Sequence, residues 1–544
     1  MAAIKALLAE VQSALLDRRM KDGMAQLERF SRVFAPLDTA DPDAPSLLLC
    51  IAMWVDAGYR DASLVRSLLA RFDPPRRRSL PLADYLQVRM AEAYCSIAEE
   101  DSDAAIEALN FVLQVRLEMD DDLLLATAFF WRSRAHRRKG EYEAALPDVA
   151  QARALAQSLH HHKLAALVQV QESWLLFQKG MSREALRMLD NAEQSLKDSD
   201  DYVTLGNIES ARGRIVRRAG EYALALTHFA RAVEIYGLLD PHHPNLARAL
   251  VNAAYVKRLM ALHLRKRMEG EDADRPARAA GAHAENSSRR ANRTRYLDVC
   301  RDALNDLSRA GEIYVAHQHH SGSGAVLVNS GYLHLDSGDI DGAATSALAA
   351  YELGNGMHDH ILMARARVLQ AAAENERVDQ QMGEDADAAI YAGLARKYAE
   401  DAVALSGQTQ NRRLIASAHL ARGMTCANDF FREWDAAADC ASQAAALLRA
   451  EDRDHLWEEL LVLKTRILRA SGIDDTLRAW SQGVVGDKSF QQLSEDFAEI
   501  VIPKVWAREG KKVSRVAERL SVSPKKVRRI LRNTGHMAAS SDGA

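Results

Sequence analysis

The strongest constraint on the fold is a pattern of small residues that recurs along the chain. Gly140, Gly180 and Gly220 lie 40 residues apart. Each has a small residue seven positions earlier and alanines five and twelve positions later, and Gly338 begins a fourth copy on the same spacings. Four copies of one four-point pattern predict an array of structural repeats. The other points are Ser133, Ala145, Ala152, Ser173, Ala185, Ala192, Gly213, Ala225, Ala232, Gly331, Ala343 and Ala350.

Each copy predicts two helices joined by a tight turn. The small residue on the first helix lets the second helix approach closely. The glycine ends the first helix in a left-handed conformation that would strain other residues. The two alanines, seven positions apart, share one face of the second helix. Because a single hairpin cannot bury its apolar face, successive hairpins are expected to stack into a solenoid.

These residues resemble the tetratricopeptide repeat (TPR), in the longer-period form of bacterial signalling and transcription proteins. The resemblance implies an all-α fold, a TPR-like α-solenoid of about ten helical hairpins over residues 1–475. Residues 1–72 fit the repeat poorly and are interpreted as an N-terminal cap. Residues 266–295 are polar, charged and poor in large apolar groups, which predicts a flexible insertion.

The composition agrees with a helical protein of a reducing compartment. Aromatic residues make up only 6% of the 544 residues, and the five cysteines are scattered, which argues against a disulfide framework. The N-terminal stretch is an amphipathic helix interrupted by Lys5, Glu10 and Asp17, unlike a signal peptide or a membrane span. We therefore expect a cytoplasmic protein with no membrane association.

Charge is distributed unevenly along the chain. Residues 503–536 carry eleven Lys or Arg and two acidic residues, a charge of +9, so the overall charge of −4 leaves −13 for the rest. A basic module attached to an acidic body indicates a polyanion-binding end. The alternative interpretation is a solvated basic face.

The repeat pattern ends before this basic segment. Residues 476–489 are interpreted as a linker, 490–536 as three short helices and 537–544 as a disordered tail. Pro503 lies inside the first of these helices and is expected to end or kink it. Ser523 and Pro524 form a favourable start for the third helix, because a hydroxyl cap is followed by proline in the first turn.

The stretch GKKVSRVAERLSVSPKKVRRILR resembles the Fis-type helix-turn-helix that ends many bacterial enhancer-binding activators, with Ala517, Leu520 and Val522 in register. Ser521 replaces the glycine that the family usually has in its turn. The resemblance implies that Pro524–Arg532 is a recognition helix entering the major groove. The DNA-binding residues that it implies are Lys511, Lys512, Ser514, Arg515, Ser523, Lys525, Lys526, Arg528, Arg529 and Arg532.

Motifs for catalysis or cofactor binding were not found. The chain has no glycine-rich phosphate loop, no Gly-x-Ser-x-Gly and no His-Glu-x-x-His. Its histidine-rich spots lack cysteines or carboxylates at a metal-ligand spacing. We expect no enzymatic activity, no cofactor and no metal.

These features together predict a bacterial DNA-binding transcription regulator. Its array would bind a peptide or protein partner in a concave groove, and its C-terminal helix-turn-helix would bind DNA. Two alternatives stay open: a non-enzymatic scaffold whose basic tail docks on protein, and a multiprotein signalling assembly triggered by DNA. Self-association is expected, because one small module alone would bind specific DNA weakly.

Overall fold

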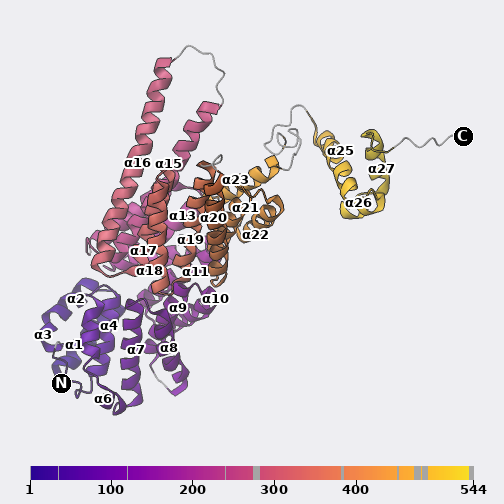
Figure 1. The fold of residues 1–544 in the computed structure, drawn as a ribbon. Helices are drawn as coiled ribbons and strands as arrows, with labels where there is room; N and C mark the ends of the chain where they lie inside the picture. The colour runs from indigo at the N-terminus through magenta and orange to yellow at the C-terminus, as the bar shows by residue number, and fades with distance from the viewer. Residues whose placement is uncertain are drawn as a thin grey trace. The chain divides into compact units, whose positions relative to one another are not determined.

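A computed structural model describes residues 2–34, 36–118, 121–238, 240–273, 282–380, 385–449, 453–470, 480 and 488–537. All regular secondary structure in these residues is helical (Figure 1). The chain divides into two compact units, Met1–Lys464 and Thr465–Ala544. Most of the expected linker at 476–489 and of the expected tail at 537–544 lies outside the described residues.

The first unit is a TPR-like α-solenoid of consecutive helix pairs (Figure 1). Its N-terminal part, which includes the expected cap, has helices of unequal length: α1 (Ala2–Leu16), α2 (Met20–Arg29), α3 (Ser31–Phe34), α4 (Ala44–Asp56), α5 (Ala62–Leu69) and α6 (Pro74–Arg78). The pairs that follow are α7 (Leu82–Ala98) with α8 (Ser102–Gln114), α9 (Asp122–Lys139) with α10 (Tyr142–Ser158), α11 (His162–Gln178) with α12 (Ser182–Leu196), α13 (Tyr202–Arg218) with α14 (Tyr222–Gly237), α15 (Pro244–Ala273) with α16 (Ala282–Ala316), α17 (His320–Asp336) with α18 (Ile340–Gly356), α19 (His360–Gln380) with α20 (Asp385–Gly407), and α21 (Arg412–Cys426) with α22 (Trp434–Leu447). The single helix α23 (His455–Ala470) comes next.

The residues of the repeat pattern have the predicted roles. Gly140, Gly180, Gly220 and Gly338 all have positive φ, between 80° and 85°, and each stands where the first helix of its pair ends. The eight patterned alanines are fully buried between helices: Ala145, Ala152, Ala185, Ala192, Ala225, Ala232, Ala343 and Ala350. The sequence prediction of helical hairpins packed through small residues is therefore confirmed.

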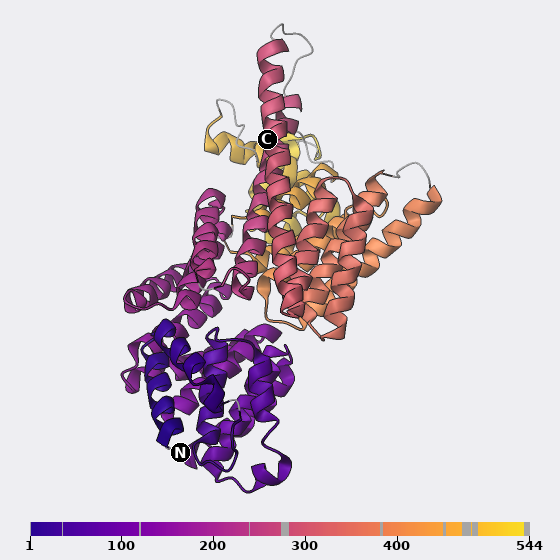
Figure 2. The same cartoon turned by 90° about the vertical axis from the view of Figure 1, so that its left-hand side faces the viewer.

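The insertion expected at 266–295 is helical, and not a loop, in the residues that the structure describes. α15 continues to Ala273 and α16 begins at Ala282, so the described residues of this segment extend two neighbouring helices (Figure 1; Figure 2 gives the view turned by 90°). The segment is rich in Ala and Arg. These residues have high helix propensity, and their polarity alone does not prevent a helix.

Residues near the end of the array bind back to the turns of its middle repeats. The backbone N–H of Gln410 donates to the carbonyl of Gly140 (2.9 Å), and that of Arg453 donates to the carbonyl of Arg218 (3.0 Å). The Arg449 guanidinium donates to the carbonyl of Gly180 (3.3 Å). The first unit therefore closes on itself, which brings α11 and α23 to the same pocket.

Candidate functional site

The second unit contains the three helices expected near the C-terminus: α25 (Phe490–Arg508), α26 (Val513–Arg519) and α27 (Pro524–Asn533). The hydroxyl of Ser523 accepts a hydrogen bond from the backbone N–H of Lys526 (3.2 Å), so it caps α27 as predicted. The three helices share one small apolar core. Its buried members are Ile502, Val516, Ala517, Val527, Ile530 and Leu531.

Two departures from the family pattern are accommodated. Ser521 adopts the left-handed φ of 51° that the family's glycine would take, so the turn between α26 and α27 forms without glycine. α25 does not end at Pro503 but continues to Arg508, and the Pro503 side chain is buried. Of the two effects expected of Pro503, an end or a kink, the helix does not end there.

The ten residues implied as DNA-binding lie on α26, on α27 and in the segments before them. All are exposed except Lys526, which is partly buried. Among the residues that the structure describes, six of these cations form no ion pair with a carboxylate: Lys511, Lys512, Arg515, Lys525, Arg528 and Arg532. The exposed surface of α27 is therefore available to a polyanion.

Glu495 on α25 is a part of this surface that sequence reasoning missed. Its carboxylate contacts Arg529 (2.5 Å) and Lys526 (3.5 Å), two of the implied DNA-binding residues. The hydrogen bond from Arg529, together with the nearby charge of Lys526, lowers the pKa of Glu495. Glu495 lies on α25, before the sequence pattern that predicts α26 and α27. Its carboxylate reaches α27 only because α25 packs against α27, which the sequence does not show.

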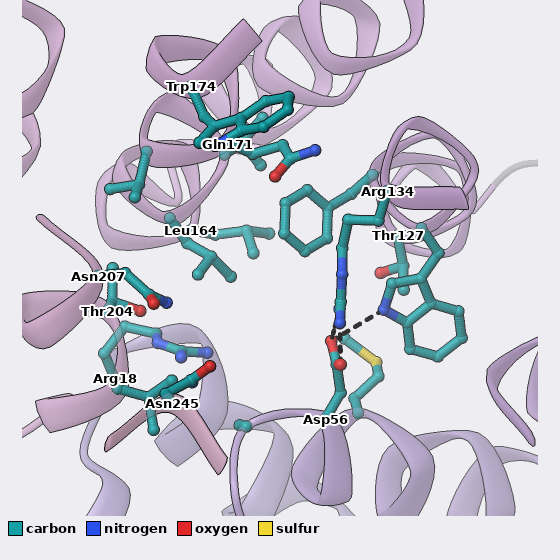
Figure 3. Close-up of a pocket in the computed structure, with 18 of the residues that line it drawn as sticks. Arg18, Asp56, Thr127, Arg134, Leu164, Gln171, Trp174, Thr204, Asn207 and Asn245 are labelled. Carbon is teal, nitrogen blue, oxygen red and sulfur yellow. Dashed lines mark hydrogen bonds and ion pairs between the residues drawn. The ribbon is translucent and has the colours of Figure 1, made fainter. Parts of the chain in front are cut away.

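The first unit has a pocket of about 180 Å³ on the surface formed by the first helices of the pairs, here called the inner surface (Figure 3). Its lining comes from α1, α4, α9, α11, α13 and α15. On one wall, Arg134 donates to both carboxylate oxygens of Asp56 (2.6 Å each), and the indole of Trp131 donates to the same carboxylate (3.0 Å). Gln171 and Trp174 form the opposite wall (Figure 3).

A second pocket of about 410 Å³ continues along the inner surface. It is lined by residues of α11, α13, α15, α16, α17, α19, α21 and α23, with Tyr255 and Tyr332 among the aromatic residues and Asn252 and Asn329 among the amides. Arg248 lines both pockets, so the two hollows adjoin. Together they offer a long concavity with apolar, aromatic and hydrogen-bonding groups, which suits an extended ligand.

Arginines at equivalent positions of two repeats could have predicted part of the inner surface from the sequence. Arg137 and Arg134 lie three and six positions before Gly140, and Arg217 and Arg214 occupy the same positions before Gly220. Because equivalent positions of stacked repeats share one face, these arginines could have been assigned to the inner surface from the alignment alone.

No group of three or more His, Cys, Asp or Glu in the described residues could hold a metal ion. No described helix combines the length and apolar character needed to cross a bilayer.

Comparisons with known proteins agree with the observed fold. A family model of the tetratricopeptide repeat matches residues 204–263. A Rap protein complexed with Competence and Sporulation Factor has 11% sequence identity and a TM-score of 0.51, with 75% of this chain and 99% of that chain covered. Two further similarities have scores too low to support a conclusion. The apo quorum sensor NprR from B. thuringiensis scores 0.38 (14% identity, covering 67% and 97%), and the human IFIT1 dimer with m7Gppp-AAAA scores 0.43 (12% identity, covering 80% and 88%).

A search of curated proteins finds no match. The helix pairs, the repeat match and the Rap similarity lead to the same conclusion, namely that this chain is a TPR-like α-solenoid protein.

Proposed function

We propose that the protein is a DNA-binding transcription regulator. In this proposal the inner surface of the repeat array binds a peptide or protein signal, and the C-terminal three-helix unit binds DNA with α27 in the major groove. The observation that carries the DNA-binding part is the arrangement of α26 and α27. A short helix, a tight turn at Ser521 and a capped basic helix with Arg528 and Arg532 exposed suit a recognition helix.

The array supports the ligand-binding part of the proposal. Its two adjoining pockets are lined by side chains from successive first helices, so an extended peptide could contact several repeats at once. A Rap protein, which has the same fold, is complexed with Competence and Sporulation Factor. The fold is therefore compatible with a signal-binding role.

The experiment that tests this proposal compares two double variants of the full chain. Arg528→Ala/Arg529→Ala removes two charges from α27, and the control Arg508→Ala/Arg519→Ala removes two charges from the same unit outside the implied DNA-binding set. Binding to duplex DNA is measured by fluorescence anisotropy. We expect the first variant to lose about tenfold or more in affinity, and the control to lose much less.

Equal losses of DNA affinity in the two variants would show that the unit attracts DNA through its overall charge and not through α27. Failure of the parent protein to bind DNA at low salt would contradict the proposal and favour the alternative, a non-enzymatic scaffold whose basic tail docks on protein.

A further inference from the structure

The first pocket of the inner surface has more cationic than anionic side chains. Five arginines line it, and Asp56 is the one carboxylate among its described lining residues. Two arginines are neutralised, because Arg134 pairs with Asp56 and Arg18 pairs with the buried Asp201 (2.6 Å). The other three form no ion pair with a described carboxylate: Arg137, Arg214 and Arg248.

The described partners of these three guanidinium groups are uncharged. Arg137 lies over the Trp174 ring, 5.0 Å from its centroid, and Arg214 donates to the carbonyl of Ser210 one turn earlier (3.2 Å). Arg248 donates to the side-chain oxygen of Asn207, while its Nε is buried and has no described hydrogen-bond partner. A ring face, a carbonyl and an amide oxygen carry no negative charge, so they do not neutralise the three guanidinium groups.

A second polar group in the same pocket also has no described hydrogen-bond partner. The amide nitrogen of Gln171 is buried and makes no hydrogen bond to a described residue, and the side chain is more than nine-tenths buried. Figure 3 shows Gln171 beside Trp174 at the wall of the pocket. A buried donor without an acceptor costs free energy, so an acceptor supplied by a ligand would stabilise this side chain.

The electrostatics of the unliganded pocket are unfavourable to these arginines. Burial, reinforced by the charges of Arg134, Arg248 and Arg214, lowers the pKa of Arg137 well below its usual range. Burial, followed by the charge of Arg248, lowers the pKa of Arg214 to about 9. Like charges held together in a partly dehydrated site favour the binding of an anion between them.

We propose that this pocket binds the carboxylate or phosphate group of a ligand, with Arg137, Arg214 and Arg248 as its counter-ions and Gln171 as an additional donor. Guanidinium groups suit such oxyanions, because their planar N–H donors match two oxygens at once. The proposal rests on the ligand-binding role proposed above for the array, and it specifies the chemical class of the group that is recognised.

The test uses the full chain without DNA, so its result is independent of whether the protein binds DNA. The probes are inorganic pyrophosphate, citrate and penta-alanine with a free or an amidated C-terminus. Binding is followed by calorimetry and by the change in melting temperature. We expect saturable binding of at least one oxyanion probe, and we expect Arg137→Met and Arg214→Met each to weaken it about tenfold or more.

Arg132→Met is the matched control. Arg132 lies on the same helix as Arg137, but it pairs with Asp148 (2.6 Å) and does not line the pocket. Its loss should lower the melting temperature, because Asp148 is left buried without its partner, and should leave probe binding unchanged. Arg137→Met should instead keep or raise the melting temperature of the unliganded protein, because it removes a charge that has no counter-ion.

The four probes also distinguish the source of the oxyanion. Binding of the free but not the amidated peptide would identify a peptide carboxylate, whereas preference for pyrophosphate would identify a phosphate.

The proposal is overturned if no probe binds the parent protein at millimolar concentration. It is also overturned if Arg132→Met weakens binding as much as Arg137→Met, or if Arg137→Met destabilises the unliganded protein as Arg132→Met does.

Discussion

At the scale of single residues, the spacing between paired helices depends on positions that have no side chain. A Cβ atom added at Gly213 on α13 would lie 2.8 Å from the ring of Phe229 on α14, and one added at Gly206 would lie 2.5 Å from the ring of Tyr236. Both rings are fully buried, so they have little room to move. These two glycines let α14 approach α13 closely.

Gly213→Ala should therefore destabilise the array. Overpacking against Phe229 is expected to lower the free energy of unfolding by about 1–3 kcal/mol. Gly393→Ala on α20 is the control, because a Cβ there meets nothing within 4 Å. The control should raise the free energy of unfolding by about 1 kcal/mol through its higher helix propensity. Urea unfolding measures both, and equal changes at the two sites would contradict the packing argument.

At the scale of elements, a carboxylate on α25 partly neutralises the positive charge on the exposed surface of α27. Glu495 holds Arg529 and Lys526 in ion pairs, although the exposure of these groups limits the contribution of each pair to stability. The same carboxylate would repel a DNA backbone brought to α27. In the proposed function, DNA binding by these two cations would therefore have to break their ion pairs with Glu495.

Glu495→Gln should strengthen DNA binding. The change removes one negative charge near α27 and releases two cations, so the affinity for duplex DNA at low salt should rise severalfold. The control is Asp496→Asn, which removes the neighbouring acid that pairs with Lys488 (2.7 Å) instead. Fluorescence anisotropy compares them, and an equal gain from Asp496→Asn would show that only net charge matters.

Local signals made most elements predictable, and tertiary contacts account for what was missed. The turn glycines, the patterned alanines and the Ser523 cap each act within one hairpin or one turn, so the sequence shows them directly. The pairing of Glu495 with Arg529 depends on how helices pack, and sequence spacing does not reveal it. The helices at 266–273 and 282–295 were not predicted, because the polar composition was interpreted as a loop although its many Ala and Arg residues favour a helix.

At the scale of the whole first unit, stability depends on contacts between distant repeats. Glu143 and Gln410 are 267 residues apart, yet the backbone N–H of Glu143 donates to the Gln410 side chain (2.6 Å). Glu100, which follows α7, accepts hydrogen bonds from the backbone and the hydroxyl of Ser321 at the start of α17 (2.9 and 2.7 Å). No repeated pattern marks these residues, so the closure of the array could not be predicted.

The Glu100 contact should make the closed array sensitive to acid. Burial alone would raise the pKa of Glu100, but the charges of His319 and Arg138 and the hydrogen bonds from Ser321 outweigh burial and lower it. A lowered folded-state pKa adds stability that is fully present above the unfolded value of about 4.3 and is lost as pH falls through the folded-state pKa.

Glu100→Gln should therefore lower the free energy of unfolding by about 1–3 kcal/mol at neutral pH. The difference from the parent protein should shrink once the pH falls below the folded-state pKa, where the parent carboxyl is protonated as well. Thermal unfolding across a pH series measures this. A difference that does not depend on pH would show that the charge of Glu100 is not what stabilises the contact.

The most direct test of the proposed regulator is the salt dependence of DNA binding by the full chain. We expect the logarithm of the affinity to fall linearly with the logarithm of the salt concentration, by about 0.9 for each phosphate contact. In Arg528→Ala/Arg529→Ala this slope should be reduced by about two contacts. Absence of binding at low salt, or a slope that this variant leaves unchanged, would contradict the assignment of α27 as the DNA-binding helix.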